Sequence, residues 1–154
     1  MSPRLAYEKI APEPLKALLT LERYLSACSL DPRLIDLVKL RASQVNGCAY
    51  CIDMHWKDLR ARDESEQRLY GLDAWRESPY YTPRERAALE WTEAVTRIGE
   101  THADDASYEA ARGEFNDQEL VELTWAIAAI NAWNRIAISF RSVPGQYQPP
   151  AHHT

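Results

Sequence analysis

Apolar residues recur along the chain every three to four positions, the spacing of one face of an α-helix. We expect helices over 12–29, 32–46, 48–62, 83–98, 105–115 and 117–140, with a shorter helical piece at 66–70. Runs that alternate apolar and polar residues between turns, as a half-buried strand does, are missing from the sequence. The pattern therefore predicts an all-α fold.

Residues that favour helix ends stand at several of these boundaries. Asp31-Pro32 is an N-cap followed by proline at the first helical position. Asn46-Gly47 has the chemistry of a helix C-cap, and Thr82-Pro83-Arg84-Glu85 places threonine and glutamate as in a capping box. Because no linker or repeat divides the chain, we expect one domain over 1–154, with a core at about 15–140 and a flexible tail at 141–154.

The last expected helix is apolar around much of its surface. Its apolar residues include Trp125, Ile127, Ala128, Ile130, Trp133, Ile136 and Ala137. A helix of this kind is either the central core helix or part of a subunit interface. We therefore expect a homo-oligomer.

Composition narrows the class of protein. The chain has 154 residues, a formal charge of −5 and 45% hydrophobic residues, with five Trp and eight Tyr, which argues against disorder. Its longest apolar run, Trp125 to Ile130, is too short to span a membrane. An acidic chain without a Lys/Arg block disfavours nucleic-acid binding, and the N-terminus lacks the apolar region of a secretory signal. We expect a cytoplasmic protein.

Three cysteines carry the candidate chemistry. Cys28, Cys48 and Cys51 form an odd set, which argues against a disulfide framework, and Cys48-Ala49-Tyr50-Cys51 has the spacing of a redox or metal site. His55 lies one helical turn beyond Cys51, so the two side chains share a helix face. Cys48 follows Asn46-Gly47 and thus stands near a helix N-terminus, where the partial positive charge favours a thiolate.

A thiolate in this position is the nucleophile that attacks a peroxide O–O bond or a disulfide. Lowering a cysteine pKa by about two units, which makes thiolate the majority form at pH 7, takes roughly 2.7 kcal/mol. The second cysteine can then condense with the sulfenic acid before it is oxidised further.

Other interpretations of these residues stay open. The two cysteines can be buried small residues, or Cys48, Cys51 and His55 can bind zinc, although a structural zinc site uses four ligands. Cys28 is interpreted as a buried small hydrophobe and His102 as an exposed loop residue, while His152 and His153 belong to the tail.

The sequence also resembles a known family. Residues 36–55, DLVKLRASQVNGCAYCIDMH, are similar to the core motif of the AhpD-like alkylhydroperoxidases, which belong to the wider carboxymuconolactone decarboxylase-like superfamily. That motif is an acidic residue, eleven residues, then Cys-x-x-Cys-x-x-x-His. Further similarity lies in 81–93, YTPRERAALEWTE, and 131–135, NAWNR, so that the resemblance covers roughly 15–140.

The resemblance implies an all-α domain that assembles into trimers, hexamers or similar rings. By position, Cys51 is the peroxidatic thiol, Cys48 the resolving thiol, His55 the base beside Cys51, and Asp36 the acidic residue that relays protons to His55. The implied reaction is reduction of a hydroperoxide without a bound cofactor. An external dithiol, such as a thioredoxin-like protein or a lipoyl group, resets the pair.

Two positions depart from the family pattern. Asp36 stands where the family usually has glutamate, and Tyr50 stands where its best-studied peroxidases have histidine. A phenol with a pKa near 10 is no base at neutral pH, but Tyr50 can donate a hydrogen bond to a bound peroxide. The alternative function is a non-catalytic redox sensor or helical assembly protein with a reversible Cys48–Cys51 disulfide.

Overall fold

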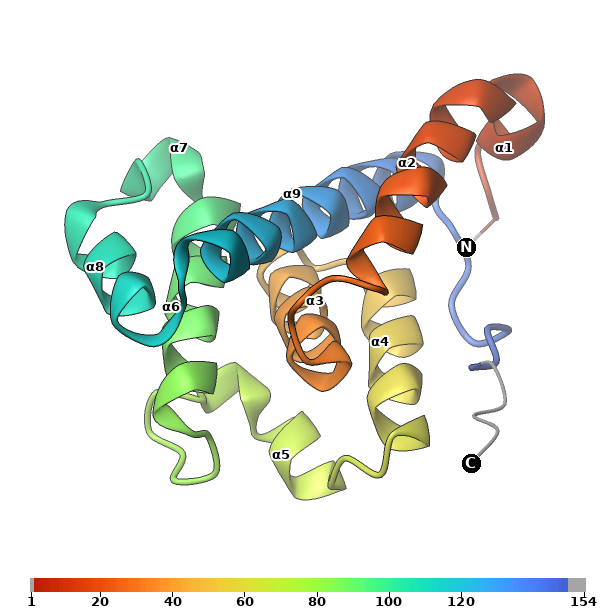
Figure 1. Ribbon diagram of the computed structural model, residues 1–154. Helices are drawn as coiled ribbons and strands as arrows, with labels where there is room; N and C mark the ends of the chain where they lie inside the picture. The colour runs from red at the N-terminus through yellow and green to blue at the C-terminus, as the bar shows by residue number, and fades with distance from the viewer. Residues whose placement is uncertain (1, 150–154) are drawn as a thin grey trace.

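The computed structural model describes residues 2–149, which contain helices and no strand (Figure 1). The elements are α1 (Tyr7–Ile10), α2 (Pro12–Leu25), α3 (Pro32–Asn46), α4 (Ala49–Ala61), α5 (Glu66–Tyr70), the short 3₁₀ helix η1 (Leu72–Ala74), α6 (Pro83–Thr96), α7 (Ile98–Thr101), α8 (Asp105–Glu114) and α9 (Asp117–Phe140). The predicted all-α class is confirmed.

The expected helix boundaries agree with the structure where capping residues stand at the ends. The Asp31 side chain accepts from the Arg33 amide at the start of α3, and Thr82 forms a capping box with Glu85 at the start of α6. The helix α2 ends at Leu25, before the expected 29, and α1 and α7 were not predicted. These two have four residues each and bury no side chain, so they leave no apolar stripe in the sequence.

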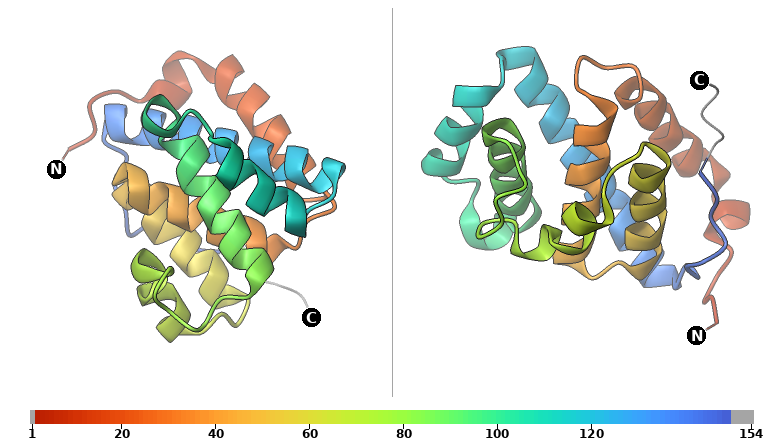
Figure 2. Two further views of the ribbon diagram at one scale, coloured as in Figure 1. Left: turned by 90° about the vertical axis from the view of Figure 1, so that its left-hand side faces the viewer. Right: turned by 90° about the horizontal axis from the view of Figure 1, so that it is seen from below.

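The helix α3 lies at the centre of the fold. It packs between α4 and α6 and against α9, which crosses over all three, while α2 lies alongside α9 and α8 packs against α6 (Figures 1 and 2). Because neighbouring helices cover α3 on several sides, it is buried from Leu34 to Ser43 at almost every position. Lys39 and Arg41 of α3 are therefore buried as well, and each forms an ion pair with a glutamate.

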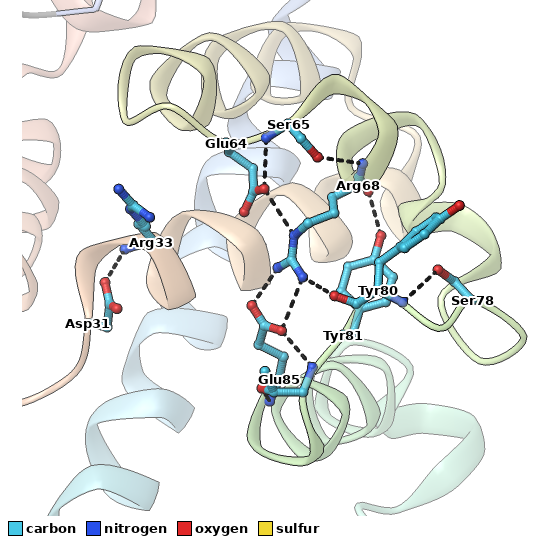
Figure 3. Close-up of polar contacts among 10 residues, drawn as sticks. Asp31, Arg33, Glu64, Ser65, Arg68, Ser78, Tyr80, Tyr81 and Glu85 are labelled. Carbon is cyan, nitrogen blue, oxygen red and sulfur yellow. Dashed lines mark hydrogen bonds and ion pairs between the residues drawn. The ribbon is translucent and has the colours of Figure 1, made fainter.

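The connection between α4 and α6 is held by Arg68 of α5. Its guanidinium contacts Glu64 Oε1 at 2.9 Å and Glu85 Oε1 at 2.5 Å, and it also donates to the Tyr80 carbonyl (Figure 3). The Tyr81 hydroxyl donates back to the Arg68 carbonyl at 2.5 Å. These contacts join α5 to the start of α6 and close the end of the bundle farthest from α9.

The helix α9 buries one broad face and leaves an apolar strip on the other. Leu123, Ile127 and Ile130 are fully buried, whereas Val121 and Trp125 are about half exposed, at 57% and 53%. The expectation that α9 is a core helix is confirmed for its buried face. Among residues 2–149, no helix combines the length and hydrophobicity that crossing a bilayer requires.

Candidate functional site

A tight turn between α3 and α4 positions the two cysteines. Gly47 takes a left-handed conformation with φ of 70°, and the Cys48 amide donates to the Ser43 carbonyl at 2.9 Å, which closes α3. Cys48 is then the N-cap of α4, and Cys51 lies one turn into that helix. The expected helix N-terminus at Cys48 is therefore present.

Both sulfurs are enclosed. Cys48 and Cys51 are each 1% exposed and unpaired in a disulfide, and they pack against Ala42 of α3 and against Ile130 and Ala137 of α9. A hydrogen bond from Cys51 lowers the pKa of Cys48 to about 6, although burial opposes the charge. The same hydrogen bond, together with burial, raises the pKa of Cys51. The pair thus loses one proton near neutrality and retains the other.

His55 lies on α4 between two carboxylates. Its Nδ1 atom is 3.6 Å from Asp36 Oδ1 and 3.5 Å from Asp58 Oδ2, and neither ring nitrogen has a hydrogen-bond partner among residues 2–149. Burial opposes protonation of the imidazole, but the two carboxylates beside Nδ1 outweigh that effect, so the pKa of His55 is raised. The geometry therefore favours an imidazolium here.

Each of the two carboxylates has a second partner. Arg62 Nε donates to Asp36 Oδ2 at 3.0 Å, and the Tyr147 hydroxyl donates to Asp58 Oδ1 at 2.7 Å. Burial raises the pKa of Asp58, but His55 and Tyr147 together outweigh that effect and leave it lowered. Arg62 and Tyr147 thereby fix the positions of the two carboxylates beside His55.

A pocket of about 790 Å3 opens over this cluster between α2, α3, α4 and α9. Cys51, His55, Asp36, Asp58 and Tyr50 all contribute to its lining. Its other walls are mostly apolar and include Leu15, Leu19, Leu25, Ile35, Met54, Trp133 and Ala137. Cys48 is absent from the described residues that line it, so Cys51 is the sulfur on the pocket side.

A buried charged group forms another part of the pocket wall. Lys39 of α3 is 6% exposed, and its Nζ atom contacts Glu22 Oε2 at 2.5 Å. Trp133 of α9 donates its indole hydrogen to Glu22 Oε1 at 2.9 Å. This group joins α2, α3 and α9 around the mouth of the pocket.

The segment after α9 completes the site. Lys57 of α4 donates to the carbonyls of Gly145 and Tyr147, and the Gly145 amide donates to Asp53 Oδ2 at 3.0 Å. These contacts set Tyr147 against Asp58 at the pocket wall. The predicted tail residues His152 and His153 lie outside the described residues.

The structure brings together the five predicted site residues Asp36, Cys48, Tyr50, Cys51 and His55. Sequence reasoning missed Asp58, Tyr147, Lys39, Glu22 and Trp133. A usable signal existed for Glu22, a charged residue inside the otherwise apolar stripe of α2. For Tyr147 no signal existed, because its partner is 89 positions away in the chain.

Three side chains of types that can ligate a metal lie close together at this site. Among residues 2–149, Asp36, His55 and Asp58 have ligand atoms within 4.8 Å of one another, and neither sulfur belongs to that group. The three-ligand zinc set Cys48, Cys51 and His55 is therefore not assembled in this geometry. As expected, His102 is exposed. Cys28, which was expected to be buried, is only partly buried and packs at the edge of the main apolar core.

Several known proteins are similar to this chain in sequence, and one of them has a solved structure with the same fold. Residues 12–94 match the carboxymuconolactone decarboxylase family. The uncharacterized protein YdfG of Bacillus subtilis is 43% identical over 139 residues, which is 90% of this chain and 95% of YdfG. ATU0492 of Agrobacterium tumefaciens, of unknown function but described with the name AhpD and a role in antioxidant defence, is 49% identical with a TM-score of 0.91 over 95% of this chain and all of its own.

A more distant structure shares the fold alone. The alkylhydroperoxidase AhpD core protein of Ralstonia eutropha JMP134 has a TM-score of 0.79 at 20% identity, over 90% of this chain and 74% of its own. The family match covers more than half of the chain and includes the whole Cys-x-x-Cys-x-x-x-His motif. The chain is an AhpD-like member of the carboxymuconolactone decarboxylase family.

Proposed function

We propose that the protein is a thiol-dependent peroxidase that reduces hydroperoxides through Cys48 and Cys51 and serves antioxidant defence. The observation that carries the proposal is the position of Cys51. Cys51 lines the same pocket as His55, while Cys48 packs beside Cys51 away from the pocket lining and accepts a hydrogen bond from it. A bound peroxide therefore meets Cys51 first.

The reaction begins with a proton transfer inside the pair. The Cys51 proton moves to the Cys48 sulfur, which places the negative charge on the pocket side. The Cys51 thiolate attacks the outer peroxide oxygen, the O–O bond breaks, and Cys51 becomes a sulfenic acid while an alkoxide leaves. Cys48 then attacks that sulfur, water departs, and a disulfide forms.

His55 supplies the proton that the leaving alkoxide needs. Its pKa is raised by Asp36 and Asp58, so an imidazolium is available beside Cys51, where it also stabilises the thiolate. Nε2 is buried without a hydrogen-bond partner among residues 2–149, and we propose that its proton is the one given to the alkoxide. Asp36 lies 3.6 Å from Nδ1 and balances the positive charge of the imidazolium, and it is the residue proposed to relay the next proton to His55.

Tyr50 is proposed to orient the peroxide. It is half-buried in the pocket lining, and burial raises its pKa, so it acts as a hydrogen-bond donor and not as a base. No bound cofactor is needed for these steps. An external dithiol, thioredoxin-like or lipoyl, reduces the disulfide, and the protein acts as a homo-oligomer.

The test is peroxide consumption with a dithiol as reductant. We expect Cys51→Ser to lose both turnover and the single-turnover sulfenic acid that dimedone traps. Cys48→Ser is expected to lose turnover but retain trapping, since only the resolving step is removed. Cys28→Ser, which changes a thiol outside the pocket, is the matched control and keeps full activity. Unchanged turnover in Cys51→Ser would show that another group reacts.

The same assay separates the alternative function. A redox sensor forms and loses the Cys48–Cys51 disulfide but consumes no more peroxide than a variant lacking both thiols. Such a result would replace the peroxidase proposal with the sensor.

A further inference from the structure

Asn134 of α9 is a buried polar residue beside the cysteine pair with no role in the steps above. Its side chain is fully buried, at 0% exposure. It lies between Ile130 and Ala137 on the helix face that packs against both sulfurs. A polar group in such an apolar setting has a free-energy penalty unless its hydrogen bonds are satisfied.

The surrounding hydrogen bonds determine which way the Asn134 amide points. The Ser43 hydroxyl donates its hydrogen to the Lys39 carbonyl at 2.7 Å, so its oxygen can only accept from Asn134 Nδ2, at 3.1 Å. Asn134 Oδ1 in turn accepts from Asn46 Nδ2 at 2.8 Å. The Asn134 oxygen and nitrogen are thereby distinguished by their partners.

One hydrogen of the Asn134 amide is left over. An amide nitrogen carries two hydrogens, and Ser43 accepts only one of them. Among residues 2–149, the second has no oxygen acceptor. Asn134 stands between Ile130 and Ala137 on the α9 face that packs against both sulfurs, and its amide lowers the pKa of both thiols. A charged sulfur is a stronger acceptor than a neutral thiol.

We propose that Asn134 is a thiolate-binding residue, whose second amide hydrogen bonds whichever sulfur of the pair is charged. The proposal rests on the thiol chemistry proposed above, because the charge moves from Cys48 to Cys51 when the proton moves the other way. The second hydrogen is not the one that Ser43 accepts, and Oδ1 keeps its bond from Asn46, so neither of those bonds has to break. It thus stabilises the negative charge before and after the transfer.

The test measures thiol ionisation in the reduced protein and needs no peroxide. The probe is iodoacetamide, with the alkylation rate of each cysteine followed against pH by mass spectrometry. In Asn134→Leu we expect the lower thiol pKa of the pair to rise by about one unit, which leaves about tenfold less thiolate at neutral pH. Asn134→Asp keeps the shape and the acceptor oxygen but lacks the donor, so it shifts the pKa in the same direction even if the leucine variant fails to fold.

Ser43→Ala is the matched control within the same network. It removes the competing acceptor and leaves both Asn134 hydrogens to the sulfurs, so the thiol pKa stays unchanged or falls. If these hydrogen bonds were purely structural, Ser43→Ala and Asn134→Leu would loosen the network equally and would change the thiol pKa by the same amount. Equal upward shifts in Ser43→Ala and Asn134→Leu, or no shift in either Asn134 variant, would overturn the inference.

The outcome is separable from the peroxidase assay. If the Asn134 variants shift the thiol pKa and the wild type consumes no peroxide, the thiolate-binding role stands and the peroxidase proposal falls. If wild-type turnover is present and the pKa does not move, only the role of Asn134 is lost.

Discussion

Tyr147, in the segment after α9, donates its phenolic hydrogen to Asp58 Oδ1 at 2.7 Å. This hydrogen bond connects the C-terminal segment to the carboxylate that faces His55 at 3.5 Å. Because Tyr147 also lines the pocket, the segment is part of the site.

Replacing Tyr147 with phenylalanine removes the hydroxyl group and its hydrogen bond but keeps the aromatic ring. We expect Tyr147→Phe to lower the free energy of unfolding by about 1 kcal/mol, since the Asp58 carboxylate loses a donor. Urea denaturation measures the change. Tyr70→Phe is the control, because Tyr70 is 74% exposed, and it is expected to have no effect. Equal stabilities for the two variants would contradict the structural role of Tyr147.

His55 should remain protonated above the ordinary histidine pKa of 6.5, because two carboxylates flank its Nδ1 atom. A raised pKa means that the bound proton stabilises the fold below pH 6.5, and that this contribution is lost as the pH rises through the folded-state value. Asp58→Asn removes one of the charges and lowers the titration midpoint of His55.

The measurement is an NMR titration of the histidine rings in the reduced protein. The exposed His102 is not among the pocket-lining residues, so its ring signal serves as the reference in wild type and variant. If the His55 midpoint does not move in Asp58→Asn, the second carboxylate plays no electrostatic part.

The lowered pKa of the Glu122 carboxyl predicts that the protein loses stability in acid. Hydrogen bonding from Ser29 lowers the pKa of this carboxyl to about 2, with further bonds from Gln118 and Tyr24 outweighing burial. A lowered folded-state pKa stabilises the protein above the unfolded value of 4.5, and the contribution disappears as the pH falls from there towards about 2.

Glu122→Gln, which cannot ionise, should therefore be less stable than wild type at pH 7, with the difference shrinking between pH 4.5 and about 2. Unfolding free energies measured across that range test this prediction. Two parallel stability curves would mean that ionisation of Glu122 does not contribute.

Two glycines should respond to alanine in opposite directions. Gly47 has φ of 70°, and an added Cβ meets no atom within 4 Å, so Gly47→Ala is expected to destabilise by about 1 kcal/mol through backbone strain alone. Gly113 lies within α8 with equally open surroundings, and Gly113→Ala should stabilise by roughly 0.5 kcal/mol. Chemical denaturation compares the free energies of unfolding of both variants with that of wild type. A destabilised Gly113→Ala would contradict the expectation that alanine at an open helical position stabilises the protein.

Much of the helical framework was predictable because its signals are local. The caps at Asp31 and Thr82 act within three residues, and the Gly47 turn needs only a residue that tolerates positive φ. The helices α1 and α7 were missed because four residues that bury nothing have no periodicity to detect. Cys48, Cys51 and His55 were predictable because they lie on one helix just after a tight turn, whereas Asp36 and Tyr50 came only from the resemblance to the AhpD-like proteins.

The sequence by itself determined the longer helices, the start of α4 at Cys48 and the shared face of Cys51 and His55, since each depends on neighbours within a few positions. Only the tertiary structure decided that Cys51 faces the pocket, that Asn134 meets Ser43 across 91 positions and that Trp133 meets Glu22 across 111. Those meetings follow from how α2, α3 and α9 pack. Packing depends on the combined burial of many apolar side chains, and no single segment of the chain carries that information.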